Sequence, residues 1–395
     1  MARRSNNATA IPRPGVTTPA LARDPLDALH GVAADIAAHT LEREDAILAL
    51  ALGLIARRNV FLFGPPGTAK SRTVAALAAR VTGARAFDVL MSAFTLPEDV
   101  FGPLDIAALE AGRNERRIDG YLPTCDVAFL DEVFKAGPGI LNTLLRVVNE
   151  RTYKHGANTI TCPITFAVGA SNELPQDSSL AALYDRFPVR VAVDYVAEES
   201  SIRALLATSR TPAVGASVTL PELHAAHAAC DAVQLDATTE DAIIAIRAAL
   251  AGEGMRMSDR TLAESTALIR AHAYWYGRAV TTPEDAGVLR MVAWARPEER
   301  RKAALVVLSV AAPATGKATE LRDLAHEQLA AFRTARDGAT RIDAVEKLRK
   351  LGEECAALAR VNPANPDIRA CETAISAWRL DVMRAMTGIR APGAK

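Results

Sequence analysis

The sequence predicts an α/β fold, with a parallel sheet covered by helices, followed by regions that are entirely helical. In the first half of the chain, short apolar runs that suit buried strands alternate with stretches of helical spacing. This alternation is typical of βαβ units, and hence of a parallel sheet. Beyond about residue 198 the strand-like runs stop, and alanine-rich sequence favours helices.

The composition is that of an ordinary globular protein. The chain has 395 residues, 50% of them hydrophobic, which is enough for two or three domains with sizeable cores. Its 46 basic residues equal its 46 acidic residues, so we expect no nucleic-acid partner. No run reaches the roughly 18 apolar residues of a membrane span, and no apolar signal region follows Arg3-Arg4. We therefore expect a cytoplasmic protein without stable membrane insertion.

The cysteines indicate neither disulfides nor a zinc site. They are odd in number, widely scattered and free of any C-x-x-C pair. We expect them to be small buried hydrophobic residues. They are Cys125, Cys162, Cys230, Cys355 and Cys371.

The elements of the first half follow in order. Residues 1–24 mix Arg, Asn, Thr and Pro without periodicity and predict a flexible arm. Residues 26–56 have helical spacing and end at Arg57-Arg58-Asn59, where cations suit a helix carboxyl end. The predicted strands are 60–63, 86–91, 127–130, 164–168 and 189–193, with a helix at 140–149 and a small hairpin within 150–163.

The second half predicts helices throughout. Helix starts are expected at Thr239, Ser258 and Thr282-Pro283. After residue 298, apolar stripes predict the seam of packed antiparallel helices, with a turn at 362–366. The stripes are Leu321, Leu324, Leu329 and Phe332, and Ile368, Cys371, Ile375, Trp378 and Val382. The predicted domains are the arm (1–24), the α/β domain (25–197), an all-α lid (198–297) and a C-terminal helical domain (298–395).

The strongest chemical signal is an octapeptide between the strand at 60–63 and a helical run. Such a loop brings backbone N–H groups to a phosphate chain at the positive end of a helix. Lys70 would place its charge on the outer phosphates, and the Ser71 hydroxyl would ligate Mg²⁺. Ala69 replaces the usual glycine, which is tolerable if residue 69 has a negative φ. The loop consists of Gly64, Pro65, Pro66, Gly67, Thr68, Ala69, Lys70 and Ser71.

Polar side chains follow two further predicted strands. Asp131 and Glu132 come directly after the strand at 127–130, at the end where open parallel sheets bind ligands. Asp131 would hold the Mg²⁺ that bridges the β- and γ-phosphates, and Glu132 would deprotonate the attacking water. Asn172 would reach the γ-phosphate and help to fix that water. Taken alone, each of these is also a common loop residue.

Two arginines complete the candidate site, and each has an alternative interpretation. Arg186 precedes the last strand and would point towards a neighbouring subunit, where it would stabilise the transferring phosphoryl group. Its alternative role is a surface ion pair with Asp185. Arg260 lies in the first turn of a helix, where the helix dipole disfavours a cation, so it would contact a nucleotide phosphate or remain solvated.

Together these motifs resemble those of an AAA+ ATPase. GPPGTAKS, FLDE, GASN, LYDRF and SDR correspond in order to Walker A, Walker B, sensor 1, arginine finger and sensor 2. FTLPEDVFGPL (94–104), GYLP (120–123) and FKAGP (134–138) resemble the MoxR family, most closely its RavA branch, where Ala commonly precedes the Walker lysine. The resemblance implies ATP and Mg²⁺ as cofactors, a hexameric homo-oligomer, a helix-2 insert at about 94–104, and a partner with a von Willebrand A domain.

The family resemblance implies an ATP-hydrolysing ring that remodels a client protein, which the sequence does not identify, or inserts a metal or cofactor into it. One alternative is a subunit of a magnesium-chelatase-like enzyme, and another is a nucleotide-gated scaffold with little turnover, against which Glu132, Asn172 and Arg186 argue. The RavA branch carries a β-rich domain within its C-terminal helices, and no strand-like run at 299–386 predicts one here. We expect Phe94 and Phe101 to contact a partner, the alternative being that they cap the core.

Overall fold

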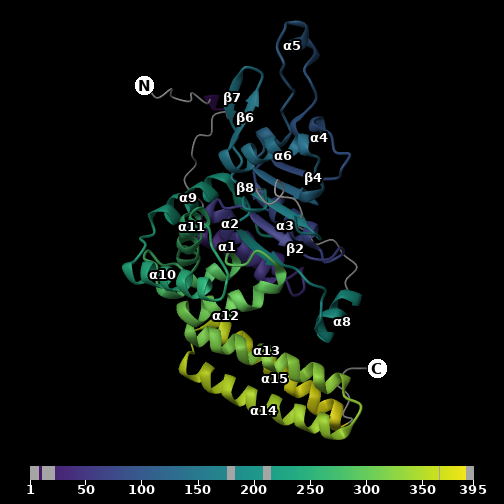
Figure 1. Cartoon of the computed structure of the whole chain (residues 1–395), viewed down its shortest axis with the longest axis vertical. Helices are drawn as coiled ribbons and strands as arrows, with labels where there is room; N and C mark the ends of the chain where they lie inside the picture. Colours follow the sequence, from purple (N-terminus) through teal and green to yellow (C-terminus); the bar gives the residue numbers. More distant parts are fainter. Residues whose placement is uncertain (1–8, 11–22, 176–182, 208–214, 364, 388–395) are drawn as a thin grey trace. The chain divides into compact units, whose positions relative to one another are not determined.

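A computed structural model of the chain describes residues 9–10, 23–175, 183–207, 215–363 and 365–387. These residues fall into two compact units (Figure 1). The first unit consists of residues up to 236 together with 257–281, and the second of 237–256 together with 282 onwards. The units cut across the predicted lid at 198–297, because its helices divide between them. Most of the predicted arm at 1–24 lies outside the described residues.

The first unit contains the predicted parallel sheet. Every strand pair in it is parallel, and the predicted alternation of strands and helices is confirmed. The fourth predicted strand, 164–168, in fact covers Phe166–Ser171, so it reaches further towards Asn172. The strand order is β4 (Ala86–Leu90), β5 (Val127–Asp131), β8 (Phe166–Ser171), β2 (Val60–Phe63) and β9 (Val189–Ala192).

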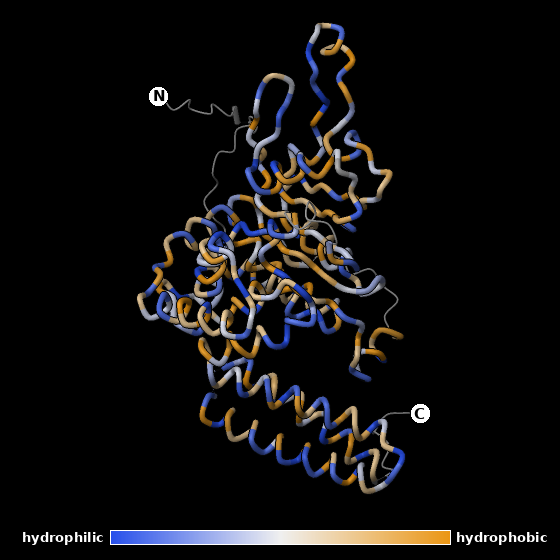
Figure 2. The backbone as a smooth tube through the Cα atoms, in the orientation of Figure 1, coloured by the Kyte–Doolittle hydropathy of each residue, from blue (hydrophilic) through white to orange (hydrophobic). Residues whose placement is uncertain are grey.

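Helices cover both faces of this sheet. α2 (Glu44–Ala56) packs on β2 and β9, α3 (Lys70–Ala78) packs on β5 and β8, and α1 (Pro25–Ala37) contacts both helices. On the other face, Phe61, Ala128 and Leu130 join a buried cluster with α6 (Pro138–Leu145). Many residues of the strands and their covering helices are therefore coloured as hydrophobic in Figure 2. The helical stretch predicted at 26–56 is two helices, because the backbone turns at Glu42, whose φ is 56°.

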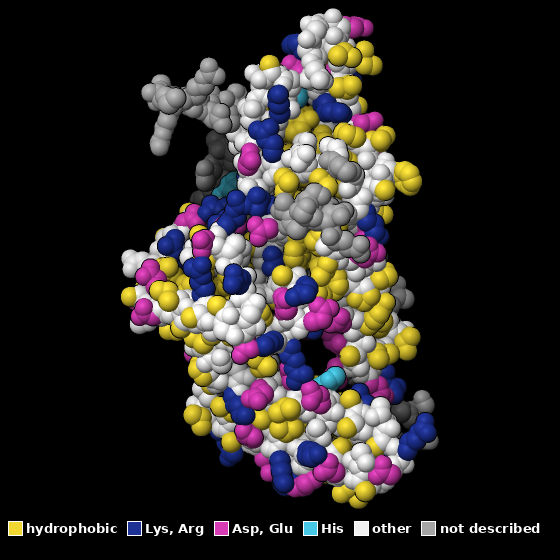
Figure 3. Space-filling view, in the orientation of Figure 1, with side chains coloured by type: hydrophobic (Ala, Val, Ile, Leu, Met, Phe, Trp, Pro, Cys, Tyr) yellow, Lys and Arg dark blue, Asp and Glu magenta, His cyan; other side chains and the backbone are white. Residues whose placement is uncertain are grey.

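Two excursions leave the sheet. One is the predicted hairpin, formed by β6 (Thr152–His155) and β7 (Asn158–Thr161) in antiparallel pairing. The other follows α4 (Pro97–Phe101) and carries α5 (Ile106–Glu110), with Leu104 and Arg116 bridging its two arms. The projecting segment therefore lies C-terminal to most of the insert predicted at 94–104. Figure 3 shows hydrophobic side chains near its tip, where Ile106 and Leu109 are exposed.

The prediction that Phe101 meets a partner is wrong, whereas Phe94 is exposed as expected. Phe94 is 89% exposed, but Phe101 is only 2% exposed. Pro97 does not interrupt a helix but begins α4, and this short helix turns Phe101 inward onto Tyr153 of β6, with ring centroids 5.7 Å apart. Phe101 therefore belongs to the core.

Helices and short elements complete the first unit. Strand signals were expected to stop at about 198, but β10 pairs with β3 in parallel. β1 pairs with the edge of β7, also in parallel. These elements are β1 (Thr9–Ala10), β3 (Val81–Thr82), β10 (Val218–Thr219), α8 (Glu199–Ala207), α9 (Leu220–Ala232), α11 (Asp259–Trp275), the 3₁₀ turns η1 (Leu122–Thr124) and η2 (Val133–Lys135), and the π-helical turn η3 (Arg146–Glu150).

The second unit is helical throughout its described residues. Its last three helices form a bundle whose core contains all five residues of the predicted stripe from Ile368 to Val382. No strand occurs among the described residues after 298, as predicted. The elements are α10 (Ala237–Gly252), η4 (Pro283–Met291), η5 (Pro297–Glu299), α12 (Arg300–Ala311), α13 (Pro313–Thr334), α14 (Gly338–Val361) and α15 (Pro366–Thr387).

The structure bears on two expectations from the sequence, those for membrane spans and for the cysteines. Within the described ranges, every helix is too short or too polar to cross a membrane. All five cysteines are buried and free, as expected of small hydrophobic residues.

Candidate functional site

The strand order gathers three of the predicted motifs at one edge of the sheet. β5, β8 and β2 are neighbours, and all three run parallel. Their carboxyl ends therefore carry Asp131 and Glu132, then Ser171 and Asn172, then the loop 64–69. Because this edge is where open parallel sheets bind ligands, the topology supports the predicted nucleotide site.

The backbone of the loop is shaped by its close neighbours. A Cβ on Gly64 would lie 2.0 Å from the carbonyl oxygen of Val193, so only glycine fits there. Gly67 has a φ of 80°. Ala69 has a φ of 63°, so the condition under which alanine would fit without strain, a negative φ, is not met. The backbone of Ala69 is therefore in the left-handed region, which costs an L-residue about 1–2 kcal/mol relative to the right-handed region.

Lys70 lies in the first turn of α3 and is buried. Its Nζ donates to the carbonyl oxygens of Gly64 at 2.6 Å and Pro65 at 2.9 Å, so the ammonium lies against the loop. Burial lowers the pKa of Lys70, and the carboxylates of Asp131 and Glu132 partly oppose that shift. The cation is thus held where a phosphate chain following the loop would meet it.

The residues predicted to hold Mg²⁺ are in contact with each other. The Ser71 hydroxyl donates to Oδ2 of Asp131 at 2.7 Å, across sixty residues of sequence. Hydroxyl and carboxylate oxygens are ligands that Mg²⁺ accepts, usually together with waters and substrate phosphates. Among the described residues no group of three or more Asp, Glu, His or Cys side chains could hold a metal by itself. The pair therefore fits a metal that the phosphates help to bind.

Glu132 has a strained backbone and defined partners. Its φ of 49° is uncommon for a residue with a side chain, and such strain costs on the order of 1–3 kcal/mol. Its Oε2 pairs with Nζ of Lys135 at 3.3 Å and accepts from the Ser171 hydroxyl at 3.4 Å. Asn172 is half-buried, and its Oδ1 is buried without a hydrogen-bond partner in the described part of the chain.

Three neighbours of this site were not singled out from the sequence. Ser171 and Lys135 contact Glu132, and their places within the motifs GASN (169–172) and FKAGP (134–138) were the available signal. Arg43 is buried, and it donates to the carbonyl oxygens of Thr68 at 3.1 Å and Asp194 at 2.9 Å. It thus ties the loop to the segment that follows β9, and no local pattern in the sequence predicts this contact.

Arg186 lies at the opposite edge of the sheet from the loop. It precedes β9, whose Val189 pairs with Val60 at the start of β2, and its carbonyl oxygen accepts from Asn59 at 3.0 Å. The loop begins only after β2, which spans roughly 13 Å at about 3.3 Å per residue. The Arg186 side chain is 20% exposed and pairs with Asp185 at 3.1 Å, so the predicted ion pair is present.

Arg260 also starts from this opposite edge. Ser258 caps the helix α11, as predicted, and Arg260 is exposed in its first turn. One turn later, the carbonyl oxygen of Glu264 accepts from Nε of Arg58, directly before β2. Within the described residues Arg260 has no hydrogen bond or ion pair, and no contact brings it to the loop.

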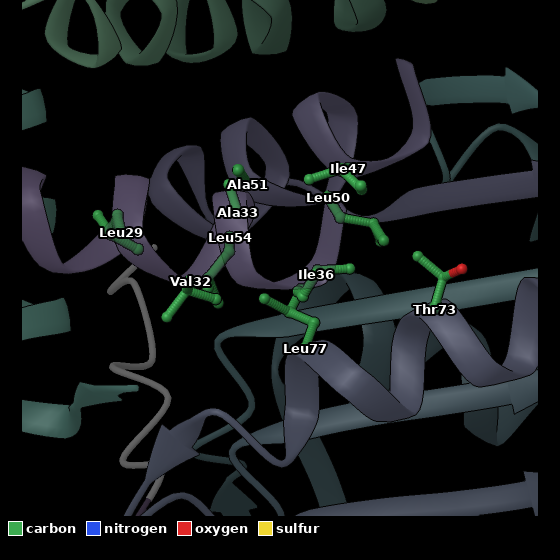
Figure 4. A pocket seen from close by; sticks show the side chains of 10 residues that line it. All are labelled: Leu29, Val32, Ala33, Ile36, Ile47, Leu50, Ala51, Leu54, Thr73 and Leu77. Atoms are coloured by element: carbon green, nitrogen blue, oxygen red, sulfur yellow. The ribbon is translucent and has the colours of Figure 1, made fainter. Parts of the chain in front are cut away.

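One pocket of the first unit has no charged side chain in its lining. It lies between α1, α2 and α3 (Figure 4) and is lined by apolar side chains and Thr73. The Thr73 hydroxyl donates to the Ala69 carbonyl oxygen at 2.9 Å and is therefore satisfied within α3.

Known proteins resemble the chain over most of its length. A family model that describes the MoxR domain of MoxR–von Willebrand A–β-propeller ternary systems matches residues 27–224, and an AAA lid model matches 238–307. An uncharacterized protein of Methanocaldococcus jannaschii is 32% identical over 298 residues, which is 75% of this chain and 79% of that protein. Chaperone MoxR1 of Mycobacterium tuberculosis is 26% identical over 46% of this chain and 51% of that protein. A solved structure from Cytophaga hutchinsonii, proposed to be an ATPase, is similar in fold, with a TM-score of 0.58 at 17% identity over 72% of this chain and 94% of that one.

Proposed function

The chain belongs to the MoxR family of AAA+ ATPases, and we propose that it is an ATP-hydrolysing motor that assembles into a hexameric ring and remodels a partner protein. The observation that carries this proposal is the division of the predicted site between two edges of one sheet. Lys70, Ser71, Asp131 and Glu132 gather at the carboxyl edge, and Arg186 lies at the amino edge. A complete site then needs two copies of the chain.

The residues at the carboxyl edge suit hydrolysis of a phosphoanhydride. Lys70 and the loop N–H groups bind the phosphates in the ground state. Ser71 and Asp131 would hold Mg²⁺, which neutralises charge on the phosphate oxygens when bound. Glu132 accepts a proton from the water whose oxygen attacks the γ-phosphorus, while the bond from that phosphorus to the bridging oxygen breaks and ADP leaves. Asn172 orients this water.

Arg186 would act on the nucleotide of a neighbouring subunit. The strand between Arg186 and the loop keeps its guanidinium away from the phosphates of its own chain. An arginine supplied in trans stabilises charge on the transferring phosphoryl group and raises the rate by on the order of 10³-fold or more. Arg260 starts from the same edge and would reach a phosphate from that side.

The partner is inferred from the family. The matching model describes MoxR domains that occur with von Willebrand A and β-propeller proteins, so we infer a partner of the von Willebrand A type. The exposed apolar residues Phe94, Ile106 and Leu109 offer contact surface for such a partner. Within the family we keep the RavA-like branch as our proposal, supported by the three-helix bundle of α13, α14 and α15.

A subunit-mixing experiment tests the proposal. Arg186→Ala is expected to bind ATP normally and to hydrolyse it at least 100-fold more slowly, and Glu132→Gln is expected to behave likewise. Mixed rings of the two variants should regain turnover, because some interfaces pair an intact Glu132 with an intact Arg186. If verified mixed rings recover no turnover, Arg186 does not act in trans. If the unmodified chain binds ATP without measurable turnover, the nucleotide-gated scaffold is the better description.

A further inference from the structure

A second pocket of the first unit surrounds Arg186 at the amino edge of the sheet. Its cavity volume is about 360 Å³, within the range of small-molecule sites. It is lined by residues that follow α2, by the end of η3 and Arg151 after it, by the segments before β8 and β9, and by Glu264 of α11. The charged residues among them are Arg57, Arg58, Arg151, Arg186 and Glu264, four cations against one carboxylate.

Two of these arginines have no counter-ion in the part of the chain that the structure describes. Arg57 pairs with Asp231 at 2.5 Å and Arg186 with Asp185 at 3.1 Å. Arg58 donates only to the carbonyl oxygens of Glu264 and Arg57, and among the described residues it has no ion pair. Arg151 likewise donates only to uncharged oxygens there. The pocket therefore has positive charge that the described residues do not neutralise.

Two residues that line this pocket also have buried nitrogen atoms that lack acceptors. Nη1 of Arg151 and Nε of Arg186 are buried and have no hydrogen-bond partner in the described part of the chain. A buried donor without an acceptor costs about 1–3 kcal/mol, and more when it is charged. Burial and the charge of Arg58 lower the pKa of Arg151 to about 10. An anion entering the pocket would relieve the repulsion between these cations.

Asn59 forms hydrogen bonds to both Arg151 and Arg186. Its Oδ1 accepts from Nη2 of Arg151 at 3.3 Å and from the backbone of Ala167 at 3.2 Å. Its Nδ2 donates to the carbonyl oxygens of Arg186 at 3.0 Å and Val148 at 3.3 Å. This buried amide thus uses both of its donors and its acceptor to join the segments that carry the two arginines.

The backbone before Arg151 is irregular. The π-helical turn η3 ends at Glu150, directly before Arg151, which has a φ of 55°. π-Helical turns and left-handed residues with side chains occur often at functional sites, where strain aims a side chain. Helices often end in this left-handed conformation, but glycine is the residue most often found there.

We propose that Arg58 and Arg151 act together with Arg186 as a cationic pocket that receives the terminal phosphate of ATP bound to a second copy of this chain. The proposal rests on the proposed ring-forming function, because the ring would bring the nucleotide of a neighbouring copy to this edge. Arg151 and Arg58 supply fixed N–H donors to the phosphate oxygens, and planar guanidinium groups match such oxygens well. Each arginine would then contribute to turnover and little to the ATP affinity of its own subunit.

The test uses the full chain and three single variants. Arg151→Ala and Arg58→Ala each remove one unpaired cation. Arg146→Ala is the matched control, because Arg146 lies in the same π-helical turn but is exposed and pairs with Glu150 at 3.6 Å. Steady-state ATP hydrolysis, binding of a fluorescent ATP analogue, ring assembly and melting temperature are measured for each.

We expect Arg151→Ala and Arg58→Ala to lower kcat at least tenfold, with nucleotide affinity within threefold and assembly retained, and Arg146→Ala to match the unmodified chain. Mixing Arg151→Ala with Glu132→Gln should restore turnover, because an arginine that acts in trans leaves some interfaces complete. If Arg151→Ala does not fold, the same mixing experiment with Arg58→Ala decides.

Three results would overturn the proposal. Unchanged kcat in both variants would show that the pocket does not act on the phosphate. Loss of assembly with normal turnover per assembled ring would indicate that the pocket binds an acidic side chain of the neighbour instead. Recovery with Arg186→Ala but not with Arg151→Ala or Arg58→Ala would leave the proposed ring mechanism intact and refute only the role of the pocket. Failure of the Arg186→Ala mixture as well would refute the ring mechanism itself.

Discussion

Two phenylalanines near the projecting segment have different roles. One stabilises the fold, and the other is free to contact a partner. Phe101 is buried against Tyr153, whereas Phe94 is almost fully exposed. Phe101→Ala removes a buried ring and leaves a cavity, which costs about 3–5 kcal/mol of unfolding free energy. Phe94→Ala removes no buried contact, so its effect should stay within about 0.5 kcal/mol.

These energies convert to separable melting temperatures. For a domain of about 150–250 residues, 1 kcal/mol corresponds to roughly 2–4 °C, so Phe101→Ala should melt about 6–20 °C lower than the unmodified chain. Phe94→Ala should melt within about 2 °C of it. Calorimetry of the transition that contains the first unit measures both variants. ATP hydrolysis by Phe94→Ala should be normal, and only stimulation of that hydrolysis by a partner should fall.

The reasoning fails if both variants melt alike. A normal melting temperature for Phe101→Ala would mean that its burial in α4 contributes nothing, contrary to the packing on Tyr153. A drop of more than about 5 °C for Phe94→Ala would mean that this ring is part of the core after all. Leu109→Ala, an exposed change on α5, serves as the control for surface substitutions.

Three further predictions concern the loop, the catalytic carboxylate and pH. Lys70→Ala should abolish ATP binding, whereas Glu132→Gln should keep binding and lose turnover, as measured by nucleotide titration and phosphate release. Ala69→Gly should raise the unfolding free energy by up to about 1 kcal/mol in urea, because glycine accepts the positive φ of 63° at residue 69 without strain. Burial lowers the pKa of His227 from 6.5 to about 4, so the stability associated with its neutral form is present above pH 6.5 and is lost as the pH falls towards 4, by about 3 kcal/mol in all. His227→Gln should keep the hydrogen bond to the Leu54 carbonyl oxygen and abolish that part of the pH dependence.

Each of these has an internal check. Equal loss of ATP affinity in Lys70→Ala and Glu132→Gln would contradict the separation of roles. A destabilised Ala69→Gly would mean that unfolded-state entropy outweighs the strain. His224→Gln, an exposed change one turn before His227, should alter the pH dependence of urea unfolding much less, because burial of His227 and not the charge of His224 is the largest cause of its pKa shift. The same slope between pH 7 and 5 in His227→Gln and the unmodified chain would rule His227 out as its source.

The parts of the site that local sequence could predict are those with local causes. The loop 64–71 and the carboxylates after β5 follow apolar strand runs, and the parallel sheet places them together. The φ of Ala69 could not be predicted, because it depends on how the loop closes against Val193 and not on residue type. The burial of Phe101 was missed because α4 has only five residues, and its packing on the hairpin gives it an inward face.

The sequence interpretation of residues 57–59 missed their contacts with residues far away in the chain. Arg57, Arg58 and Asn59 were taken as the end of a helix, since cations favour that position. Asn59 in fact bonds to residues 89, 92, 108 and 127 positions away in the chain. Such contacts leave no periodicity in the sequence, so neither the pocket nor the role of Arg151 in it could be inferred without the strand order.

Because the proposed site is divided between two edges of the sheet, activity should depend on protein concentration. If Glu132 works at one edge and Arg186 at the other, each complete site is an interface, and a single chain has none. A closed ring then has as many sites as subunits, whereas an open ring has one fewer. At concentrations too low for assembly, the chain should bind ATP through Lys70 yet hydrolyse almost none of it. Turnover per subunit should rise with protein concentration while nucleotide affinity stays constant, and a turnover per subunit that does not change on dilution to monomers would contradict the division of the site between two copies.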